Sequence, residues 1–376
     1  MGKKFSRRQF VGAAGATSLF ALAGSTAEAA EENDAVREKI VTTGSNLQSA
    51  LNNHGVVRIS GVLDVSDETP IRVPNYRSIH GSGAFEFANH SQEMDVLYDD
   101  SPGPTLEITG NHVRVHGIGI ANNNADGTGI KCVGYSPNLS TLEIDGGDVG
   151  VQFGESSADT TPTEPRINFC KIYSHNNGSI GIHAEDMYDA KIINNVVGGY
   201  DVGISVDTNH AYLTGNHTYA YPSSSMSTGI RIAARWVRCV NNRVEDGIQD
   251  AGIELADWFG DSMVLGNLIQ TSAGANGIDW TTNISDGEIE NVIIAHNQIG
   301  TTWGENNGDV AIKIGAELHN SYVGNNIIFD FDHVGDATIT SSGTPSASNH
   351  MPGVVVEDTS DGSLWYRAAS GMKQIG

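Results

Sequence analysis

The sequence predicts an all-β solenoid of short strands wound into stacked coils, because it carries two interleaved repeats and almost no helical periodicity. The two repeats recur every 21 to 34 residues and interleave without a break. The first is a Gly-Ile-x-apolar block at Gly129, Gly181, Gly203, Gly229, Gly252 and Gly277, with substituted copies at Gly150 and Ala311. The second is an asparagine with an apolar residue three positions before it, at Asn195, Asn216, Asn242, Asn267, Asn297 and Asn326.

Strand alternation predicts which side chains of these blocks face inward. The isoleucine and the next apolar residue of each Gly-Ile block point into the coil, and the residue between them points to solvent. The repeated asparagines are expected to stack along the axis at a bend, where their amides satisfy backbone groups and bond to one another. The strand pattern thus predicts both a core and an outward row.

The two ends of the solenoid need caps, because a terminal coil exposes unpaired strand edges. Residues 30–54 are predicted to be an N-terminal segment that contains a short helix over 45–51. The first strand is predicted over 56–59. Residues 346–376 predict a β-hairpin cap, with strands at 353–356 and 363–367 around an Asp361-Gly362 turn.

Three cysteines follow the N-terminal region, namely Cys132, Cys170 and Cys239. The repeat register points all three inward, with Cys170 at the position that asparagine holds in later coils. Their spacing supports neither a disulfide nor a zinc site, so they are expected to be buried free thiols.

The N-terminus, residues 1–29, is typical of a secretion signal with twin arginines. Arg7 and Arg8 precede an apolar run over 11–23, and Ala27-Glu28-Ala29 follows it. The run is shorter than the roughly 20 residues of a membrane-spanning helix. We expect cleavage near Ala29 and export of the folded protein to the exterior or the cell surface, with no membrane attachment after cleavage.

The composition is strongly acidic, with 21 Lys and Arg against 45 Asp and Glu and a formal net charge of −24. Residues 1–29 hold four of the positive charges and one negative charge, so their removal leaves about −27. This charge opposes binding to nucleic acid or anionic membranes. The few lysines resemble haloarchaeal composition and indicate a halophilic source.

The repeat resembles the pectate-lyase-like superfamily over about residues 55–345. This resemblance implies a right-handed parallel β-helix of about ten coils and a role connected with polysaccharides. The superfamily contains lyases, glycoside hydrolases, epimerases, phage tailspikes and non-catalytic surface proteins, so the reaction depends on the residues of the side groove. The chain lacks the Trp-Ile-Asp-His and Arg-x-Pro-x-x-Arg motifs of the main pectate lyases.

The outward positions of the Gly-Ile blocks contain the chemistry expected of such a groove. Neighbouring coils lie about 4.8 Å apart, so these residues should form one continuous row. The row is Lys131, Gln152, His183, Ser205, Arg231, Glu254, Asp279 and Lys313, with Glu185 and Asp207 in a second row.

An anionic sugar polymer is the predicted partner of this surface. Arg231, Arg235, Arg238 and Arg243 form the densest positive charge after residue 29. Aromatic residues in flanking loops would stack on sugar rings, and the candidates are Tyr188, Tyr200, Tyr219, Tyr221 and Trp258. Uronate-rich or sulfated polysaccharides would supply the negative charge.

Cleavage of a uronate polymer by β-elimination is the predicted reaction. It needs a base, a cation that neutralises the uronate carboxylate and a proton donor for the leaving oxygen. His183 and Arg231 are the candidate base, acid and neutralising groups, and Glu254 completes the predicted catalytic set. Lyases of the superfamily often use calcium, for which Glu185, Asp207 and Glu254 would supply oxygen ligands. The predicted substrate-binding residues are Lys131, Arg235, Arg238, Tyr219, Tyr221, Trp258 and Asp279.

Two other functions fit the same residues. A glycoside hydrolase would use paired carboxylates from the set Glu185, Asp207, Glu254 and Asp279. A cell-surface or spike protein would bind carbohydrate without turnover, as a monomer or a trimer. The outward polar residues would then be ordinary surface groups, with ion pairs that each contribute under about 1 kcal/mol.

Overall fold

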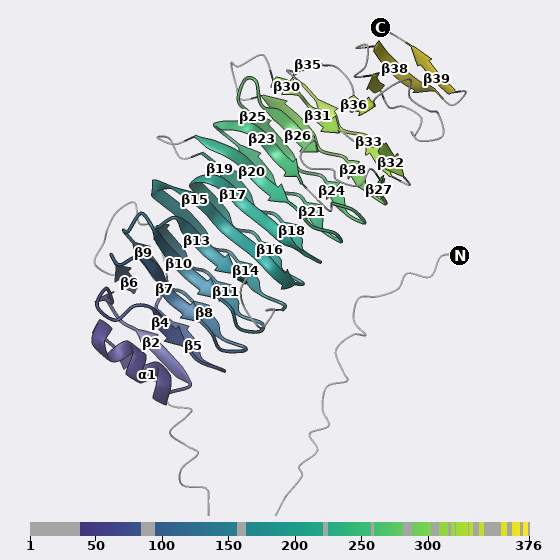
Figure 1. Cartoon of the computed structure of the whole chain (residues 1–376). Helices are drawn as coiled ribbons and strands as arrows, with labels where there is room; N and C mark the ends of the chain where they lie inside the picture. The colour runs from purple at the N-terminus through teal and green to yellow at the C-terminus, as the bar shows by residue number, and fades with distance from the viewer. Residues whose placement is uncertain are drawn as a thin grey trace, which may run out of the picture. The chain divides into compact units, whose positions relative to one another are not determined.

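The protein is a parallel β-solenoid of about nine turns with one short helix, as the computed structural model in Figure 1 shows. The expected all-β fold is confirmed. The structure describes these residues: 38–83, 95–155, 163–220, 225–256, 259–280, 288–301, 308–314, 317–319, 321–329, 331–333, 338–341, 355–358, 363–368 and 371–374. The N-terminal signal predicted over residues 1–29 lies outside them.

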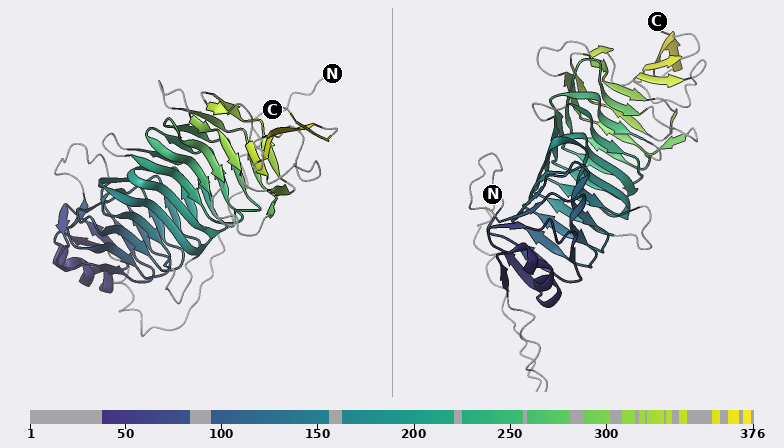
Figure 2. Two further views of the ribbon diagram at one scale, coloured as in Figure 1. Left: turned by 45° about the horizontal axis from the view of Figure 1, so that its top comes forward. Right: turned by 60° about the vertical axis from the view of Figure 1, so that its left-hand side comes forward.

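Each coil contributes strands to three faces, which Figure 2 shows from two further sides. Face 1 is a separate 12-stranded parallel sheet. Its strands are β1 (Lys39–Val41), β2 (Val56–Ile59), β5 (Ser78–His80), β8 (Arg114–His116), β11 (Asn138–Ser140), β14 (Arg166–Asn168), β16 (Lys191–Ile193), β18 (Tyr212–Thr214), β21 (Arg238–Val240), β24 (Met263–Leu265), β28 (Ile293–Ala295) and β33 (Tyr322–Gly324).

Faces 2 and 3 belong to one hydrogen-bonded sheet, because β15 (Lys171–Tyr188) and β17 (Val196–Asn209) run through both. Face 2 begins after the bend that follows each face-1 strand. Its other strands are β3 (Val62–Asp64), β6 (Val96–Asp99), β9 (Gly119–Asn122), β12 (Glu143–Gly146), β19 (His217–Tyr219), β22 (Arg243–Glu245), β25 (Leu268–Thr271), β29 (Gln298–Thr301) and β34 (Ile327–Ile328). Face 3 contains β4 (Ile71–Val73), β7 (Gly103–Ile108), β10 (Gly127–Cys132), β13 (Val149–Phe153), β20 (Met226–Ile232), β23 (Ile248–Leu255), β26 (Asn276–Trp280), β31 (Ile312–Ile314) and β36 (Thr338–Ser341).

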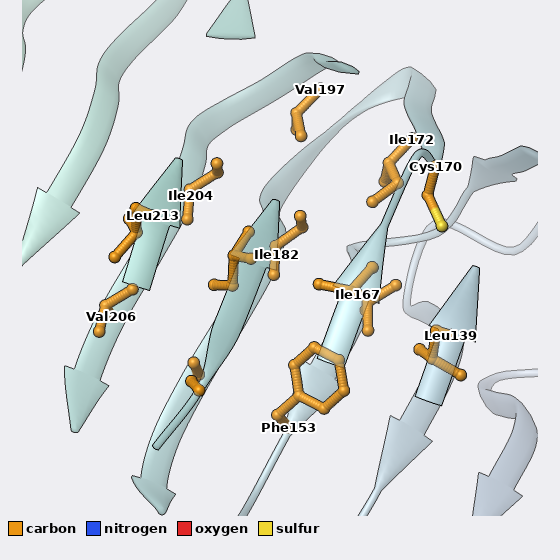
Figure 3. Packing of buried hydrophobic residues seen from close by; sticks show 14 of the residues in the cluster. Leu139, Phe153, Ile167, Cys170, Ile172, Ile182, Val197, Ile204, Val206 and Leu213 are labelled. Atoms are coloured by element: carbon orange, nitrogen blue, oxygen red, sulfur yellow. The ribbon is translucent and has the colours of Figure 1, made fainter. Parts of the chain in front are cut away.

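The core is a stack of aliphatic side chains between the three faces. Within face 3, Ile182 pairs with Ile204 and Ile204 with Ile230, and all three are fully buried. Figure 3 shows this packing, in which Phe153, Ile182 and Ile204 point into the coil beside residues from the other faces. The alternation predicted for the Gly-Ile blocks is therefore confirmed.

A ladder of buried asparagines forms the bend between faces 1 and 2. The Oδ1 atom of Asn242 accepts from the backbone N–H of Asn216 at 2.9 Å and from Asn216 Nδ2 at 3.0 Å. Asn242 Nδ2 in turn donates to the Leu213 carbonyl and to Asn267 Oδ1, both at 3.0 Å. The same pattern joins each of the six predicted asparagines to its neighbour in the ladder. These bonds satisfy polar groups whose burial would otherwise be costly.

The glycine of each Gly-Ile block allows faces 2 and 3 to approach closely. A Cβ atom on Gly229 would lie 2.3 Å from a methyl group of Val244 and 2.7 Å from the Gly252 carbonyl oxygen. The β-branched side chains of face 2 thus occupy the space that a side chain on this glycine would need. This contact explains why the repeat begins with glycine.

The ends of the solenoid differ in detail from the predictions. A 3-10 turn, η1 (Gly44–Asn46), leads into helix α1 (Leu47–Asn53), and β1 precedes the strand predicted to be first. At the C-terminus the predicted strands are present as β37 (Val355–Asp358) and β38 (Ser363–Ala368), which pair antiparallel. A third strand, β39 (Gly371–Gln374), pairs with β38 and was not predicted. Two small parallel pairs complete the list of strands, β27 (Glu288–Glu290) with β32 (Glu317–His319) and β30 (Gly308–Val310) with β35 (Phe331–His333).

Cys132, Cys170 and Cys239 are buried free thiols, as predicted. Cys170 occupies the ladder position before Asn195, since its backbone N–H donates to Asn195 Oδ1 at 3.0 Å. Burial in apolar surroundings raises the pKa of the Cys170 thiol to about 12, which makes it unreactive at neutral pH. In the part of the chain that the structure describes, no helix is long and apolar enough to cross a membrane.

We predict that Asn242→Ala lowers the free energy of unfolding by about 3 kcal/mol, because it strands buried donors and acceptors in two neighbouring coils. Asn123→Ala is the matched control, since this exposed amide makes one bond to the Tyr98 hydroxyl. Its expected cost is below about 1 kcal/mol. Denaturant unfolding followed by circular dichroism measures both values. Equal losses in the two variants would contradict a structural role for the ladder.

Candidate functional site

Face 3 places one outward residue from each coil in a single row. The strand register pairs Lys131 with Gln152, Gln152 with His183, and so on through Lys313. The row predicted from the repeat therefore has the expected order. Pairing with β7 and β4 extends it toward the N-terminus through Glu107 and Arg72.

His183 lies near the middle of this row, on the part of β15 that belongs to face 3. Its Nε2 atom lies 3.3 Å from the Oε2 atom of Glu185, two residues later on the same strand. The side chains of His183 and Glu185 are 19% and 22% exposed. The two groups are thus partly screened from water while still open to a ligand on the face.

Burial lowers the pKa of His183, and the nearby Arg231 guanidinium lowers it further. The carboxylates of Glu185 and Asp207 act in the opposite direction but do not outweigh burial. His183 is therefore a neutral imidazole at pH 7, with a nitrogen able to accept a proton.

Arg231 lies two coils beyond His183, with the small, buried Ser205 between them in the row. Two coil spacings correspond to about 10 Å between the backbones of His183 and Arg231. The Nε atom of Arg231 lies 3.7 Å from Glu254 Oε2, and the arginine side chain is 47% exposed. Glu254 thus orients a guanidinium that still faces solvent.

Asp207 lies beside Glu185 in the second outward row. Partial burial raises the pKa of Asp207, and repulsion from Asp186 and Glu185 adds to the shift, while Arg231 and His183 oppose it. His183, Glu185, Asp207 and Arg231 therefore form one electrostatically coupled group, which we call the face-3 cluster.

The predicted calcium ligands do not converge. Glu185 and Asp207 are neighbours, but Glu254 is engaged by Arg231. In the described portion of the chain, no group of three or more His, Cys, Asp or Glu side chains is arranged to hold a metal ion. Calcium takes six to eight oxygen ligands, and the residues present do not form such a set, so we assign no step to calcium.

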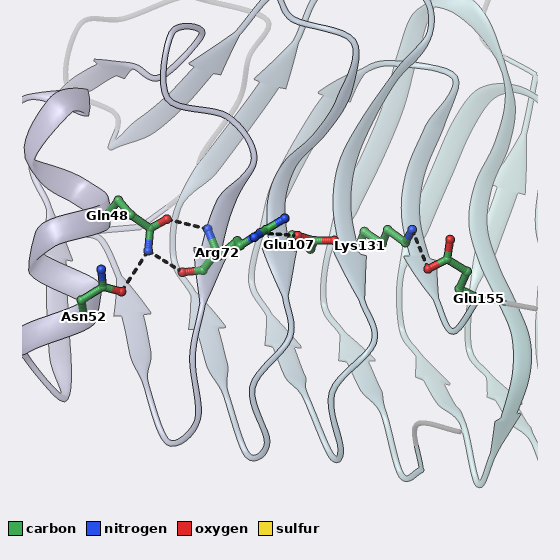
Figure 4. Close-up of polar contacts among 6 residues, drawn as sticks. All are labelled: Gln48, Asn52, Arg72, Glu107, Lys131 and Glu155. Carbon is green, nitrogen blue, oxygen red and sulfur yellow. Dashed lines mark hydrogen bonds and ion pairs between the residues drawn. The ribbon is translucent and has the colours of Figure 1, made fainter. Parts of the chain in front are cut away.

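The N-terminal part of the row consists of paired charges. Arg72 pairs with Glu107 at 2.9 Å and Lys131 pairs with Glu155 at 2.9 Å, and both pairs are drawn in Figure 4. A cavity of about 420 Å³ lies beside Arg72, between α1 and face 3. Lys131, a predicted substrate-binding residue, thus lies in the row but already has a carboxylate partner.

Asp279, another predicted substrate-binding residue, lies in the C-terminal part of the row. It neighbours Glu254 on one side and Lys313 on the other. The Nδ2 atom of Asn276 donates to Asp279 Oδ2 at 2.6 Å, which fixes the carboxylate on the face.

The structure separates the four arginines that are close in sequence. Arg231 lies on face 3, Arg238 on face 1 and Arg243 on face 2. Arg235 lies in the turn between faces 3 and 1, where it pairs with Asp261 at 2.9 Å. The expected single anion site of four arginines does not exist, because thirteen residues here pass through all three faces.

The candidate aromatic residues also separate. Tyr200 is buried at 1% exposure, and its hydroxyl donates to the backbone carbonyls of Gly146 and Tyr173, so it is a core residue rather than a sugar platform. Tyr219 lies on face 2, away from the face-3 row. Tyr188, which is 45% exposed, ends β15. Tyr221 and Trp258 lie outside the described residues.

A second polar cluster on face 2 was not predicted. His217 Nε2 lies 3.0 Å from Glu245 Oε1, and Arg243 Nε also bonds to this carboxylate. Burial lowers the pKa of His217. His217, Arg243 and Glu245 each follow a ladder asparagine by one or three residues in the sequence. Comparing the residues at these two positions from coil to coil would therefore have predicted the cluster.

Comparisons with known proteins show the fold. No protein-family model and no curated protein sequence matches the chain. A DFA-IIIase from Arthrobacter chlorophenolicus A6, solved with DFA-III bound, matches with a TM-score of 0.52 and 14% identity, over 84% of this chain and 86% of that one. The Dettilon tailspike matches with a TM-score of 0.48 and 15% identity over 77% of this chain, which spans 66% of the tailspike's length. PfbA, a surface adhesin of Streptococcus pneumoniae, matches with a TM-score of 0.46 and 10% identity, over 89% and 98% of the two chains.

The charges around His183 predict the direction in which variants shift its pKa. Asp207→Asn removes a carboxylate that stabilises the imidazolium ion, so the pKa falls further below about 6.5. Arg231→Gln removes a cation that destabilises that ion, so the pKa rises. NMR titration of labelled histidine measures both shifts in pKa. The control variant is Asp201→Asn, which removes a carboxylate from β17, the strand that also contains Asp207. Shifts of the same sign in both variants would contradict the proposed coupling.

Proposed function

We propose that the protein is a secreted polysaccharide lyase that cleaves a uronate-containing polymer on face 3. The observation that carries the proposal is a neutral, partly buried His183 in the same row as a solvent-facing Arg231. The resemblance of the repeat to the pectate-lyase-like superfamily supports a polymer substrate. The row runs along the solenoid, so successive sugars would contact successive coils.

The proposed mechanism is a β-elimination. The guanidinium of Arg231 pairs with the uronate carboxylate and makes the proton on the adjacent ring carbon more acidic. The imidazole of His183 accepts that proton, a carbon–carbon double bond forms, and the bond to the leaving glycosidic oxygen breaks. The resulting imidazolium returns the proton to the leaving oxygen, which restores neutral His183.

The other members of the cluster hold these two groups in place. The Glu185 carboxylate lies 3.3 Å from the His183 Nε2 atom on the same strand and stabilises the transient imidazolium. Glu254 orients the Arg231 side chain. Asp207 is electrostatically coupled to both His183 and Arg231 and balances their charges.

We predict that the purified chain, in high salt, generates unsaturated product from at least one member of a panel of acidic polysaccharides, seen as rising ultraviolet absorbance. Arg231→Ala should lower kcat/KM by about 100-fold or more, because it removes a charge contact made to the developing anion. Arg72→Ala is the matched control, since Arg72 lies in the same row but pairs with Glu107. Parallel reactions with calcium and with a chelator test the calcium dependence that the resemblance implies.

Each alternative result has a distinct meaning. New reducing ends without ultraviolet absorbance would replace elimination by hydrolysis. Equal loss in Arg231→Ala and Arg72→Ala would remove Arg231 from the mechanism. No product from any polymer of the panel would overturn the enzymatic proposal in favour of a surface protein.

Hydrolysis is the second candidate because of Asp207. A glycoside hydrolase needs one carboxyl group with a raised pKa as the acid and a second carboxylate as base or nucleophile. The pKa of Asp207 is raised, and Glu185 is its register partner. Under this alternative, Asp207→Asn abolishes the formation of reducing ends, whereas under elimination it changes the pH profile more than the maximal rate.

We also propose that the chain is exported in folded form and works at high salt. The twin arginines and the net charge of −24 support this proposal. Replacing both Arg7 and Arg8 by lysine should prevent export, and fractionation of producing cells detects the chain inside instead of outside. Unchanged export of the double variant would contradict the twin-arginine route.

A further inference from the structure

Face 1 has an unusual charge distribution for so acidic a chain. The chain has 45 Asp and Glu residues, yet none lies in the twelve strands of face 1. These strands instead contain six basic residues, Lys39, Arg58, Arg114, Arg166, Lys191 and Arg238. The strands of face 1 therefore carry a positive formal charge on a protein whose net charge is strongly negative.

Four of these cations form one outward row. The register aligns the first residues of β8, β11, β14, β16, β18 and β21. In chain order these residues are Arg114, Asn138, Arg166, Lys191, Tyr212 and Arg238, which we call the face-1 row. All six side chains are exposed or half-buried. At about 4.8 Å per coil, the row extends for about 24 Å along the solenoid.

The cations of the face-1 row differ from those on the other faces in lacking carboxylate partners. Arg72, Arg231 and Arg243 each form an ion pair with a glutamate. Among the described residues, Arg114, Arg166, Lys191 and Arg238 form no ion pair with any carboxylate.

Carboxylates do lie near the edge of the face-1 row. Glu164 and Asp189 are in the turns two residues before Arg166 and Lys191, and neither forms an ion pair with these cations. The positive charge of the row is therefore available to an external anion.

Exposed aromatic rings accompany the same row. The Arg238 guanidinium lies over the Tyr212 ring, with its Cζ atom 5.4 Å from the centroid. In the adjoining turn, Trp236 is 45% exposed and stacks on His210 with centroids 4.7 Å apart. Flat rings beside unpaired cations provide both apolar and charged contacts for a sugar chain.

We infer that the face-1 row binds an anionic polysaccharide that lies along the solenoid axis, at a surface distinct from the face-3 cluster. A straight row of cations at coil spacing fits a linear polymer with charges at intervals. Nucleic acid is a poorer fit, because its one charge per about 1.7 Å is strongly repelled by a protein of net charge −24. Binding at face 1 requires no turnover, so the inference does not depend on the proposed lyase reaction.

The experiment measures binding of the purified full chain to polygalacturonate by affinity electrophoresis, with neutral dextran as the reference polymer. The face-1 variant combines Arg166→Gln, Lys191→Gln and Arg238→Gln. The control variant combines Arg243→Gln, Lys171→Gln and Lys373→Gln, which removes three positive charges that lie outside both the face-1 row and the face-3 row. We expect the Kd for polygalacturonate to rise about tenfold in the face-1 variant and less than about twofold in the control. Thermal unfolding of both variants verifies that they remain folded.

Further measurements make the inference falsifiable. The face-3 variant Arg231→Ala should still bind polygalacturonate, which separates binding at face 1 from failure of the proposed reaction. Equal weakening in the face-1 and control variants would mean that only total charge matters and would overturn the inference. Stronger competition by DNA than by polygalacturonate would overturn it too. A change in sedimentation from assembled to monomeric protein in the face-1 variant alone would instead identify face 1 as an interface between copies.

Discussion

The hydrogen bonds of the asparagine ladder fix the alignment of the coils on which every surface feature depends. Each ladder asparagine before Asn326 bonds the next one and also the backbone of the coil before it. Because side chains alternate along a strand, a slip of one residue between coils would turn outward groups into the core. The face-3 cluster draws residues from coils separated by about twenty to thirty positions in sequence. Its geometry therefore depends on contacts at the opposite side of the coil.

A second constraint acts where faces 2 and 3 meet. The β-branched residue of face 2 fills the space above the glycine of the Gly-Ile block, as Val244 does at Gly229. This close contact fixes the position of the glycine on each face-3 strand, and so it fixes which residue of the block points outward. The close contact between faces 2 and 3 thus explains both the glycine of the repeated Gly-Ile block and the position of the outward residue that forms the face-3 row.

The fold and the order of the face-3 row could be predicted because both follow from repeat length and strand alternation. Side-chain partners could not, because the repeat does not encode them. Arg231, Arg238 and Arg243 are close in sequence yet lie on three faces, since bends occur every few residues in a coil. Tyr200 was expected in a loop, but β17 continues through the bend and buries its ring. The positions of His217 and Glu245 after ladder asparagines place them on one face, but their direct contact does not follow from the repeat, because alternation fixes the face and not the side-chain conformation.

Under the two proposals, the charged surfaces on faces 1 and 3 have different chemical tasks, and the environments of their residues differ accordingly. Proton transfer near neutral pH needs a group whose pKa is set by burial and neighbouring charges, and His183 on face 3 has such surroundings. Holding a polymer needs cations that remain charged and accessible, which favours exposed arginines without carboxylate partners such as Arg166 and Arg238 on face 1. A solenoid can provide both, because each coil contributes outward positions to each face. On a strongly acidic protein, the absence of acidic residues from the strands of one sheet is then enough to give those strands a charge opposite to the net charge of the chain.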